Sequence, residues 1–417
     1  MHDTEACFAD FDNAELLSTE NLSRVLKDFP LKAQVVLRGL VHLEAGALAL
    51  SLPNGRRLVV KGKVAGPCAT VTLHNWNLPH RAITGGTIGA AESYIDGDWD
   101  SPDVGAFLEL FLVNADIGNR FPNRARGLMR LVEKFLHWRN ANTKTGAERN
   151  ISAHYDLGNA FYREWLDPSM TYSSALYASG ANDLQAAQAA KYRALAEATN
   201  LRPGDHVLEI GCGWGGFAEF AAIEIGCKVT GLTISREQLA FARERMHKAG
   251  IADRVELKFQ DYREETGRYD RIVSIEMFEA VGEKFWSTYF SQLKRCLKPG
   301  GKAGLQIITI KPEAYEEYRS NPDFIQKYVF PGGMLPTRDH LVDLGRNVGL
   351  RMINDFGFGS DYARTLGEWR QRFWSVWGKI EPLGFDLRFK RLWEFYFYYC
   401  EAGFRARNID VRQIVFE

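Results

Sequence analysis

The chain has 417 residues, and its hydrophobic content of 46% excludes an intrinsically disordered protein. This length exceeds what one hydrophobic core usually supports, so we expect two domains. The 52 Lys and Arg residues balance the 52 Asp and Glu residues, and the net charge therefore does not indicate a nucleic-acid-binding protein.

Residues 1–20 are acidic and lack the basic start and apolar run of a secretory signal peptide. No segment has the roughly eighteen consecutive apolar residues of a membrane-spanning helix. The six cysteines form no CxxC pair and no spacing typical of a metal site. We therefore expect a reduced, cytoplasmic protein that binds no metal.

Residues 31–95 contain four short runs of strand-forming residues, separated by turn signals at residues 53–55 and at Gly66–Pro67. The runs read AQVVLRGL, ALALSL, RRLVVKG and ATVTLHNW. This pattern predicts a small antiparallel sheet, which we assign to a smaller N-terminal α+β domain over residues 1–149.

A basic amphipathic helix is expected within residues 119–140. Its basic residues are Arg120, Arg124, Arg126, Arg130, Lys134 and Arg139, and its single acid is Glu133. Its apolar residues recur at helical spacing: Leu128, Leu131, Val132, Phe135 and Leu136. Such a helix suits the surface of an anionic membrane, and a helix packed between two domains fits the pattern equally well. The polar segment 140–150 then indicates a linker.

Beyond about residue 200, strand-like and helix-like segments alternate. The strand-like runs are HVLEIG, KVTGLTI, VELKF, RIVSIEMF and KAGLQIITI. Alternation of this kind is typical of a mostly parallel sheet with helices on both faces. We therefore predict an α/β domain over residues 150–417.

The segment VLEIGCGWGG reads as a strand followed by a glycine-rich turn. Such a turn lets the backbone approach a ligand, and the amides at the start of the next helix remain free. Gly211, Gly213 and Gly216 satisfy the GxGxxG pattern of dinucleotide-binding proteins. The ribose-binding acid of that class is missing, because GLTIS offers only Thr233 and Ser235.

Three features favour S-adenosylmethionine as the ligand instead. Glu209 precedes the first glycine, Asp261 follows the third strand where it could accept from an adenine amino group, and LKPGG precedes a later strand. A glycine turn that only packs a helix against a sheet is the structural alternative, and it does not explain these three features together.

The chain from about residue 85 onward resembles the cyclopropane-fatty-acid synthases and their relatives that modify mycolic acids. The matching motifs, in order, are HYDLGNAFYREWLDPSMTYSSALY, VLEIGCGWGG, GLTISREQ, QDYR, MFEAVG, VFPGGMLP, DYARTLGEW and FRARNIDVRQIVFE. The resemblance implies a Rossmann-like methyltransferase fold that uses S-adenosylmethionine. It further implies a substrate with a cis double bond in a phospholipid acyl chain.

The same resemblance assigns residues to the cofactor. It places Tyr172 and Ser173 along S-adenosylmethionine and Gly211 and Gly213 at its amino-acid end. Near the ribose and adenine it places Thr233, Gln238 and Asp261. Without the resemblance, the sequence would indicate that Tyr172 and Ser173 are ordinary turn residues.

In the cyclopropane synthases a Cys, a Glu, a His and a Tyr hold a bicarbonate that takes the final proton. By resemblance, Glu279 and Tyr362 occupy the Glu and Tyr positions of this chain. Ser174 replaces the Cys, and Gln306 replaces the His. Both can donate hydrogen bonds to an anion, but neither supplies the charge of an imidazolium. The sequence therefore leaves bicarbonate binding in question, and relatives that make mid-chain methyl-branched fatty acids resemble this variant site.

Attack of an alkene on a sulfonium methyl group leaves a carbocation on the acyl chain, which a dry, aromatic-lined site would protect from water. A fixed negative group nearby would stabilise that cation. We expect Glu279 to have this role, with capping of the following helix as its alternative, and we expect a structural role for Glu276. Most C-terminal aromatics, among them Trp369 and Phe373, should pack in cores, and a few should line an acyl tunnel.

The resulting prediction is an S-adenosylmethionine-dependent C-methyltransferase that acts on unsaturated phospholipids at the inner membrane surface. A homodimer is compatible with the family, and a methylene-branched product would need a reductase partner. An oxygen- or nitrogen-directed small-molecule methyltransferase is a second reading. A lipid-binding protein with an inactive methyltransferase domain is a third, which the intact EIGCGWGG motif disfavours.

Overall fold

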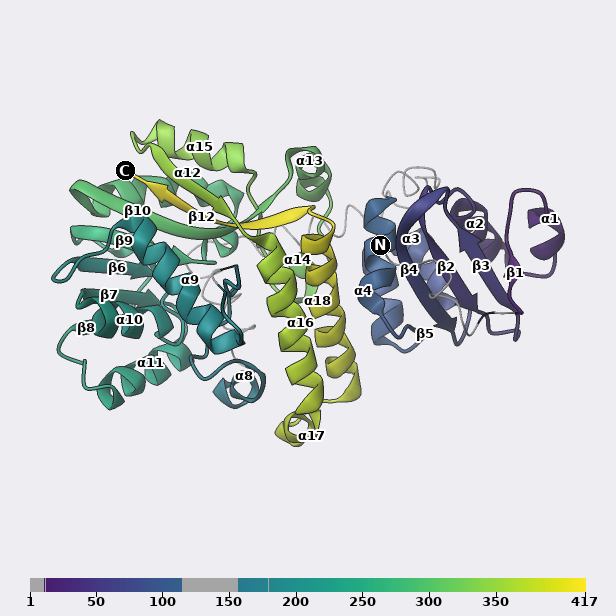
Figure 1. The fold of residues 1–417 in the computed structure, drawn as a ribbon, viewed down its shortest axis with the longest axis horizontal. Coiled ribbons are helices and arrows are strands. Elements are labelled where there is room, and N and C mark those ends of the chain that lie inside the picture. The colour runs from purple at the N-terminus through teal and green to yellow at the C-terminus, as the bar shows by residue number, and fades with distance from the viewer. Residues whose placement is uncertain (1–10, 12, 115–156, 179) are drawn as a thin grey trace. The chain divides into compact units, whose positions relative to one another are not determined.

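The structure, a computed structural model, describes residues 11, 13–114, 157–178 and 180–417 (Figure 1). The predicted basic helix, the predicted linker and the expected boundary at 149/150 lie outside the described residues. The chain forms two compact units. The first comprises Met1–Phe135 with Gly384–Ala406, and the second comprises Leu136–Leu383 with Arg407–Glu417.

The first unit contains a five-stranded sheet in the order β1-β3-β2-β4-β5. The strands are β1 (Glu15–Leu16), β2 (Ala45–Ser51), β3 (Arg57–Lys61), β4 (Val64–Leu73) and β5 (Trp99–Asp100). Three of them confirm the last three predicted runs, but the sheet is mixed rather than antiparallel because β2 pairs in parallel with β4. Residues 53–55 form the predicted turn between β2 and β3, whereas Gly66–Pro67 lies inside β4 beside a shift in register.

The first predicted strand, AQVVLRGL, is instead part of helix α2 (Leu31–Leu40). Its buried residues are Ala33, Leu37 and Leu40, which recur at the spacing of one helical face. That periodicity outweighs the strand preference of the two adjacent valines, since burying a continuous apolar stripe decides the conformation of a short segment.

The remaining helices of the first unit are α1 (Leu22–Val25), α3 (Asn77–Ile95), α4 (Val104–Val113) and α18 (Leu387–Arg405). Helix α18 packs against α3 and α4, and its buried residues include Trp393, Phe397 and Phe404. The sequence assigned this segment to the second domain. An apolar helical face indicates burial but not which of two cores receives it, and the structure places α18 in the first unit.

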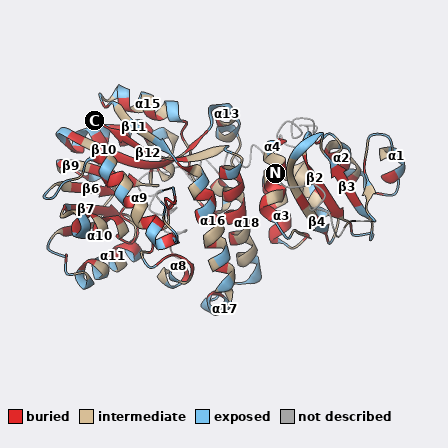
Figure 2. Ribbon diagram, in the orientation of Figure 1, coloured by how far each residue is buried: buried red, intermediate tan, exposed pale blue. Residues whose placement is uncertain are grey.

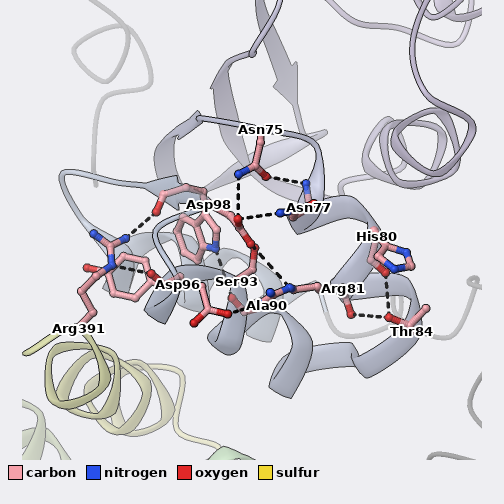
Figure 3. A network of polar contacts seen from close by, with 12 residues as sticks. Asn75, Asn77, His80, Arg81, Thr84, Ala90, Ser93, Asp96, Asp98 and Arg391 are labelled. Atoms are coloured by element: carbon pink, nitrogen blue, oxygen red, sulfur yellow. Dashed lines mark hydrogen bonds and ion pairs between the residues drawn. The ribbon is translucent and has the colours of Figure 1, made fainter. Parts of the chain in front are cut away.

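A polar network closes the turn between α3 and β5 (Figure 3). The buried carboxylate of Asp98 accepts hydrogen bonds from Asn75 at 2.8 Å, Asn77 at 2.9 Å and Ser93 at 2.9 Å. Arg391 of α18 donates to the carbonyls of Tyr94 at 2.6 Å and Trp99 at 2.8 Å, and to the Asp100 carboxylate at 2.8 Å. These bonds fasten α18 to the end of the sheet.

The second unit is built on a seven-stranded sheet in the order β11-β12-β10-β9-β6-β7-β8. Its strands are β6 (His206–Ile210), β7 (Lys228–Thr233), β8 (Val255–Phe259), β9 (Tyr269–Ile275), β10 (Leu297–Ile310), β11 (Met352–Gly357) and β12 (Ile409–Phe416). The five predicted strands are confirmed and pair in parallel, and β12 is antiparallel to both of its neighbours.

Helices cover both faces of this sheet, as predicted (Figure 1). The helices of the second unit are α8 (Asn159–Trp165), α9 (Leu184–Thr199), α10 (Gly216–Phe220), α11 (Arg236–Lys248), α12 (Trp286–Cys296), α13 (Pro312–Ser320), α14 (Phe324–Tyr328), α15 (Arg338–Asn347), α16 (Gly359–Ser375) and α17 (Trp377–Ile380). Short helical turns are η3 (Ala221–Ile225), η4 (Tyr262–Glu264), η5 (Phe278–Ala280), η6 (Glu283–Phe285) and η7 (Glu381–Leu383).

Two apolar cores result from the two-residue alternation of the strands. On β9, Ile272 joins the core shared with α12 and α15, and the next residue, Val273, joins the core shared with α9, α10 and α11. Figure 2 shows this burial concentrated along the strands. Strand order reverses between β6 and β9, so the carboxyl ends of these neighbouring strands mark the usual ligand-binding position of an open α/β sheet.

The described part of the chain contains no helix long and apolar enough to cross a membrane. Within the same residues, no cluster of three or more His, Cys, Asp or Glu side chains could hold a metal ion. The buried cysteines at 212, 227 and 296 are free thiols.

We predict that Arg391→Met loosens α18, because two backbone carbonyls and a carboxylate lose a charged donor. The expected loss is about 2 kcal/mol in the free energy of local opening, measured as faster hydrogen exchange of the α18 and β5 amides. Arg388→Met is the matched control, since Arg388 is 60% exposed and pairs with Asp96 on the surface. Equal effects of the two variants would contradict this account.

Candidate functional site

The glycine-rich turn after β6 has the backbone geometry that the sequence predicts for a ligand cradle. Gly211 has a φ of 83° and Gly213 a φ of 51°, both in the left-handed region that favours glycine. A Cβ atom added to Gly213 would meet no atom within 4 Å, so open space adjoins the backbone there. A Cβ on Gly211 would lie 2.8 Å from Cγ of Met277. The turn is therefore shaped to receive a ligand, and it abuts the segment that follows β9.

The residues expected near the ribose and adenine lie at the carboxyl ends of the next two strands. The Thr233 hydroxyl at the end of β7 donates to Oε1 of Gln238 at 3.0 Å. The Asp261 carboxylate after β8 accepts from Nε of Arg263 at 2.8 Å and from Nη2 at 2.6 Å. Arg263 thus fixes the orientation of Asp261, and the adenine-accepting role of that carboxylate stays a prediction.

The loop from Met170 to Ala178 carries three of the predicted site residues. The Asp361 carboxylate on α16 accepts from the amides of Tyr177 at 2.6 Å and Ala178 at 2.9 Å. The Thr365 hydroxyl accepts from the amide of Ala175 at 3.1 Å. Helix α16 therefore holds this loop from outside and brings Tyr362 toward Ser174.

The ring of Tyr172 lies in an aromatic cluster rather than on the surface. Its centroid is 5.2 Å from that of Trp369, 5.6 Å from Tyr162 and 5.7 Å from Trp165. Trp369 also makes an edge contact with Tyr362 at 6.2 Å. These rings give this side of the site the apolar, aromatic character that the sequence predicted for an environment able to protect a cation.

Three predicted site residues meet at a carboxylate, but it belongs to Glu276 rather than Glu279. Oε1 of Glu276 accepts from the backbone amide of Ser174 at 2.8 Å and from Nε2 of Gln306 at 2.7 Å. Its Oε2 accepts from the Tyr362 hydroxyl at 2.6 Å. The serine contributes its backbone, since its hydroxyl donates to the Ala175 carbonyl at 3.1 Å. Glu276 therefore joins three segments of the chain, and the structural role expected for it stays a prediction.

The donor role of Gln306 is fixed by its neighbour on β12. Gln306 and Gln413 face each other in the strand register, and Nε2 of Gln413 donates to Oε1 of Gln306 at 3.1 Å. Nε2 of Gln413 also donates to the Lys191 carbonyl at 3.0 Å. Because the Gln306 amide oxygen is used in this way, its NH2 group must point at Glu276.

The backbone of Glu276 is strained. Its φ of 50° is in the left-handed region, where a side chain with a Cβ costs on the order of 1 kcal/mol or more. Its amide donates to the Gln306 carbonyl at 2.8 Å, so this conformation is held by the sheet. Strain of this kind persists where the surrounding structure enforces it, and it frequently accompanies function.

Glu279 lies in η5 and faces a different partner. Its Oε1 accepts from the amide of Ile308 on β10, and its Oε2 is buried without a hydrogen-bond partner in the described residues. Within the described residues Glu279 therefore bonds to β10 and not to an amide of η6 or α12, so the helix-capping alternative for Glu279 is wrong. Burial, and next the nearby charge of Glu276, raises the pKa of Glu279 to about 8.

Two further buried charged groups belong to this neighbourhood. Lys191 on α9 is fully buried, and its Nζ donates to the Ser173 hydroxyl at 2.6 Å. Burial lowers the pKa of Lys191 to about 7, against the attraction of Glu276, Asp167 and Glu209. Burial also raises the pKa of Glu209 well above its ordinary value.

Lys191 was missed at the sequence level, although a signal existed. It lies four residues after Ala187 and seven after Leu184, within the buried stripe of α9. A lysine on the buried face of an amphipathic helix is rarely placed there without a partner.

Comparison with known proteins identifies the family of this chain. The family model described as mycolic acid cyclopropane synthetase matches residues 142–414. The chain belongs to the cyclopropane synthase family. The resemblance predicted from the motifs is therefore confirmed, as is the methyltransferase fold. The protein is an S-adenosylmethionine-dependent methyltransferase, and the open cradle at Gly213 fits that cofactor.

Individual relatives differ in what their names say they make. The tuberculostearic acid methyltransferase of Mycobacterium tuberculosis is 38% identical over 347 residues, which cover 79% of this chain and 78% of the relative. The cyclopropane-fatty-acyl-phospholipid synthase of Escherichia coli is 36% identical over 348 residues, covering 84% and 87% respectively. A crystal structure of mycolic acid cyclopropane synthase complexed with SAH and CTAB aligns with a TM-score of 0.61 at 29% identity, covering 64% of this chain and 97% of that one.

We predict that Gly213→Val abolishes binding of S-adenosylmethionine, because the branched side chain would fill the open space at the cradle. Isothermal titration calorimetry measures the loss. Gly250→Val is the matched control: Gly250 also has open space and a left-handed φ of 68°, but it lies after α11. The control should lose stability and keep the cofactor. Normal binding by the Gly213 variant would mean that the cradle is wrongly placed.

A second prediction concerns the stability of Glu279→Gln. Glu279 keeps its proton in the native state up to about pH 8, whereas the unfolded state releases it near 4.5. Rising pH therefore favours unfolding across this window, and glutamine removes that effect.

The difference in melting temperature, variant minus wild type, should increase from pH 5 to pH 8 and then level off. Differential scanning fluorimetry across this range measures it. Glu316→Gln, at an exposed position on α13, should show no such trend. A difference that shrinks as pH rises would show that native Glu279 is ionised.

Proposed function

We propose that this methyltransferase transfers a methyl group from S-adenosylmethionine to the cis double bond of an unsaturated phospholipid acyl chain. The observation that carries the proposal is a hydrogen-bonded carboxylate, Glu276, enclosed near the aromatic cluster around Trp369. An oxygen or nitrogen acceptor must lose a proton, whereas an alkene needs no base before it attacks. It does need a water-poor site and a fixed negative group for the cation that follows.

The proposed reaction forms one bond and breaks one. The alkene electrons bond to the methyl carbon, the C–S bond electrons remain on sulfur, and a positive charge is left on the acyl chain. Loss of a proton from the new methyl group closes a cyclopropane. A hydride shift before proton loss gives a methylene branch, which a separate reductase with a hydride donor would saturate.

The second product is favoured by two observations. By the family resemblance, Ser174 and Gln306 replace a Cys and a His of the cyclopropane synthases, and a relative at 38% identity is named a tuberculostearic acid methyltransferase. The cyclopropane outcome is supported by the relative from Escherichia coli, at 36% identity. We therefore propose methyl transfer to the acyl double bond, which is the step that both products share.

Such a substrate makes action at a membrane surface part of the proposal. Phospholipid acyl chains lie within the bilayer, so the protein would act as a peripheral enzyme at the cytoplasmic face. The mixed sheet of the first unit and the basic segment 119–140 are the proposed contacts with lipid. A homodimer and a reductase partner belong to the same set of proposals.

The test uses the full chain, S-adenosylmethionine and vesicles of phospholipid with one cis double bond per acyl chain. We expect S-adenosylhomocysteine to form together with acyl chains heavier by one CH2 group. Proton NMR separates the products, because ring hydrogens and vinylidene hydrogens give distinct signals. Vesicles of saturated phospholipid are the control and should give no turnover. A methyl group found on the head group, or on a water-soluble acceptor only, would contradict the proposal.

A further inference from the structure

The three donors that meet at Glu276 form an anion site whose occupant is part of the chain. They come from the loop before α9, from β10 and from α16, so the tertiary fold assembles them. Each donates to a Glu276 oxygen at between 2.6 and 2.8 Å. Burial raises the pKa of Glu276 above its ordinary value, and the three hydrogen bonds oppose this shift by favouring the charged form of the carboxylate.

A bicarbonate ion, which the family resemblance implies, does not fit this arrangement. Ser174, Gln306 and Tyr362 hold three of the four positions that would bind it by resemblance, and their donors already bond to Glu276. A second anion beside this carboxylate would add like-charge repulsion in a poorly hydrated site. The mismatch between this site and a bound bicarbonate arises because the chain has a glutamate at position 276.

We propose that Glu276 is a built-in replacement for a bound anion, and that its carboxylate takes the proton which ends the reaction. This proposal rests on the proposed function, because it names the base for that reaction. In this step a C–H bond of the cationic acyl chain breaks and its electrons form the ring bond or the double bond. The proton passes to a Glu276 oxygen and then to solvent.

The position of Glu276 beside the cofactor cradle supports this role. Glu276 follows β9 directly, and β9 pairs in parallel with β6, which leads into the glycine turn. The next residue, Met277, is the one that a Cβ on Gly211 would meet at 2.8 Å. The carboxylate is therefore one residue away from a side chain that touches the cradle.

The left-handed backbone conformation of Glu276 is a second, independent observation that supports its role as the base. A glycine would adopt a φ of 50° without strain, whereas glutamate is disfavoured there. The chain tolerates this cost at the one position where its carboxylate reaches the three donors. A side chain with only a packing role would not require these donors.

Glu279 is less suited to be the base. It accepts a backbone hydrogen bond from Ile308, and one of its oxygens is buried without a partner in the described residues. Its pKa of about 8 means that it holds a proton near neutral pH when Glu276 is charged. A protonated carboxyl group cannot accept another proton. We therefore assign the role of the base to Glu276 rather than to Glu279.

The first experiment uses the wild-type enzyme and vesicles of unsaturated phospholipid. Turnover is measured in buffer freed of carbon dioxide and again with millimolar bicarbonate. We expect equal rates in both conditions. A wild-type rate that needs bicarbonate would overturn the inference, whereas no turnover in either condition would instead contradict the proposed function.

The second experiment replaces the carboxylate. Glu276→Gly frees the three donors and relieves the backbone strain, so the variant should fold. Its turnover should fall at least about a hundredfold in bicarbonate-free buffer, with the calorimetric affinity for S-adenosylmethionine unchanged. Millimolar bicarbonate should restore a measurable part of that loss, because it can occupy the vacated site.

Glu279→Gly is the matched control, since it opens a similar space three residues away beside only one donor. Any loss that it shows should not respond to bicarbonate. Should Glu276→Gly fail to fold, Glu276→Gln keeps the side-chain shape and must show the same loss of turnover without loss of cofactor affinity. Full activity of either Glu276 variant without bicarbonate would overturn the inference.

Discussion

A buried carboxylate is unfavourable unless several donors surround it, and in this protein Glu276 has donors from three parts of the chain. The Ser174 amide, the Gln306 amide group and the Tyr362 hydroxyl converge on its two oxygens. Two of these donors are held by further contacts: α16 fastens the loop of Ser174, and Gln413 orients Gln306. The candidate site therefore depends on one carboxylate that ties β9, β10, α16 and the loop before α9 together.

The same carboxylate determines the electrostatics of its surroundings. Its charge, together with burial, raises the pKa of Glu279, and its attraction opposes the effect of burial on Lys191. Glu276, Glu279 and Lys191 lie in one poorly hydrated region, so the charge of each one shifts the pKa of the others. A cationic cofactor and a cationic intermediate would both be stabilised by a net negative group in such a region.

The parallel sheet explains why the cofactor cradle and the carboxylate lie together. β6 and β9 are neighbours although β7 and β8 separate them in sequence, and both end at the same edge. The glycine turn follows one strand and Glu276 follows the other. The first unit has a different organisation, in which Arg391 and the apolar face of α18 complete a mixed sheet. Its last helix comes from the far end of the chain.

Much of the fold and the cofactor cradle follows from the sequence alone, because both depend on local patterns. Apolar runs and their alternation predict the five parallel strands, and Gly211 and Gly213 mark the turn since their left-handed backbone suits glycine. Motifs in order along the chain identify the family. Short segments were less certain: AQVVLRGL reads as a strand by residue type but forms a helix by the spacing of its buried residues.

Only the tertiary structure could distinguish the roles of Glu276 and Glu279, which lie three residues apart. The family resemblance favoured Glu279, because it places Glu279 at the Glu position of the cyclopropane synthases. Only the folded chain shows that Ser174, Gln306 and Tyr362, up to 188 positions apart in the numbering, meet at Glu276. The partner core of α18 was decided in the same way. Hydrogen bonds and packing between distant segments produce no periodic pattern in a sequence. The sequence therefore determined the helices, the strands and the cofactor-binding turn. The tertiary structure determined which of the two glutamates the donors surround.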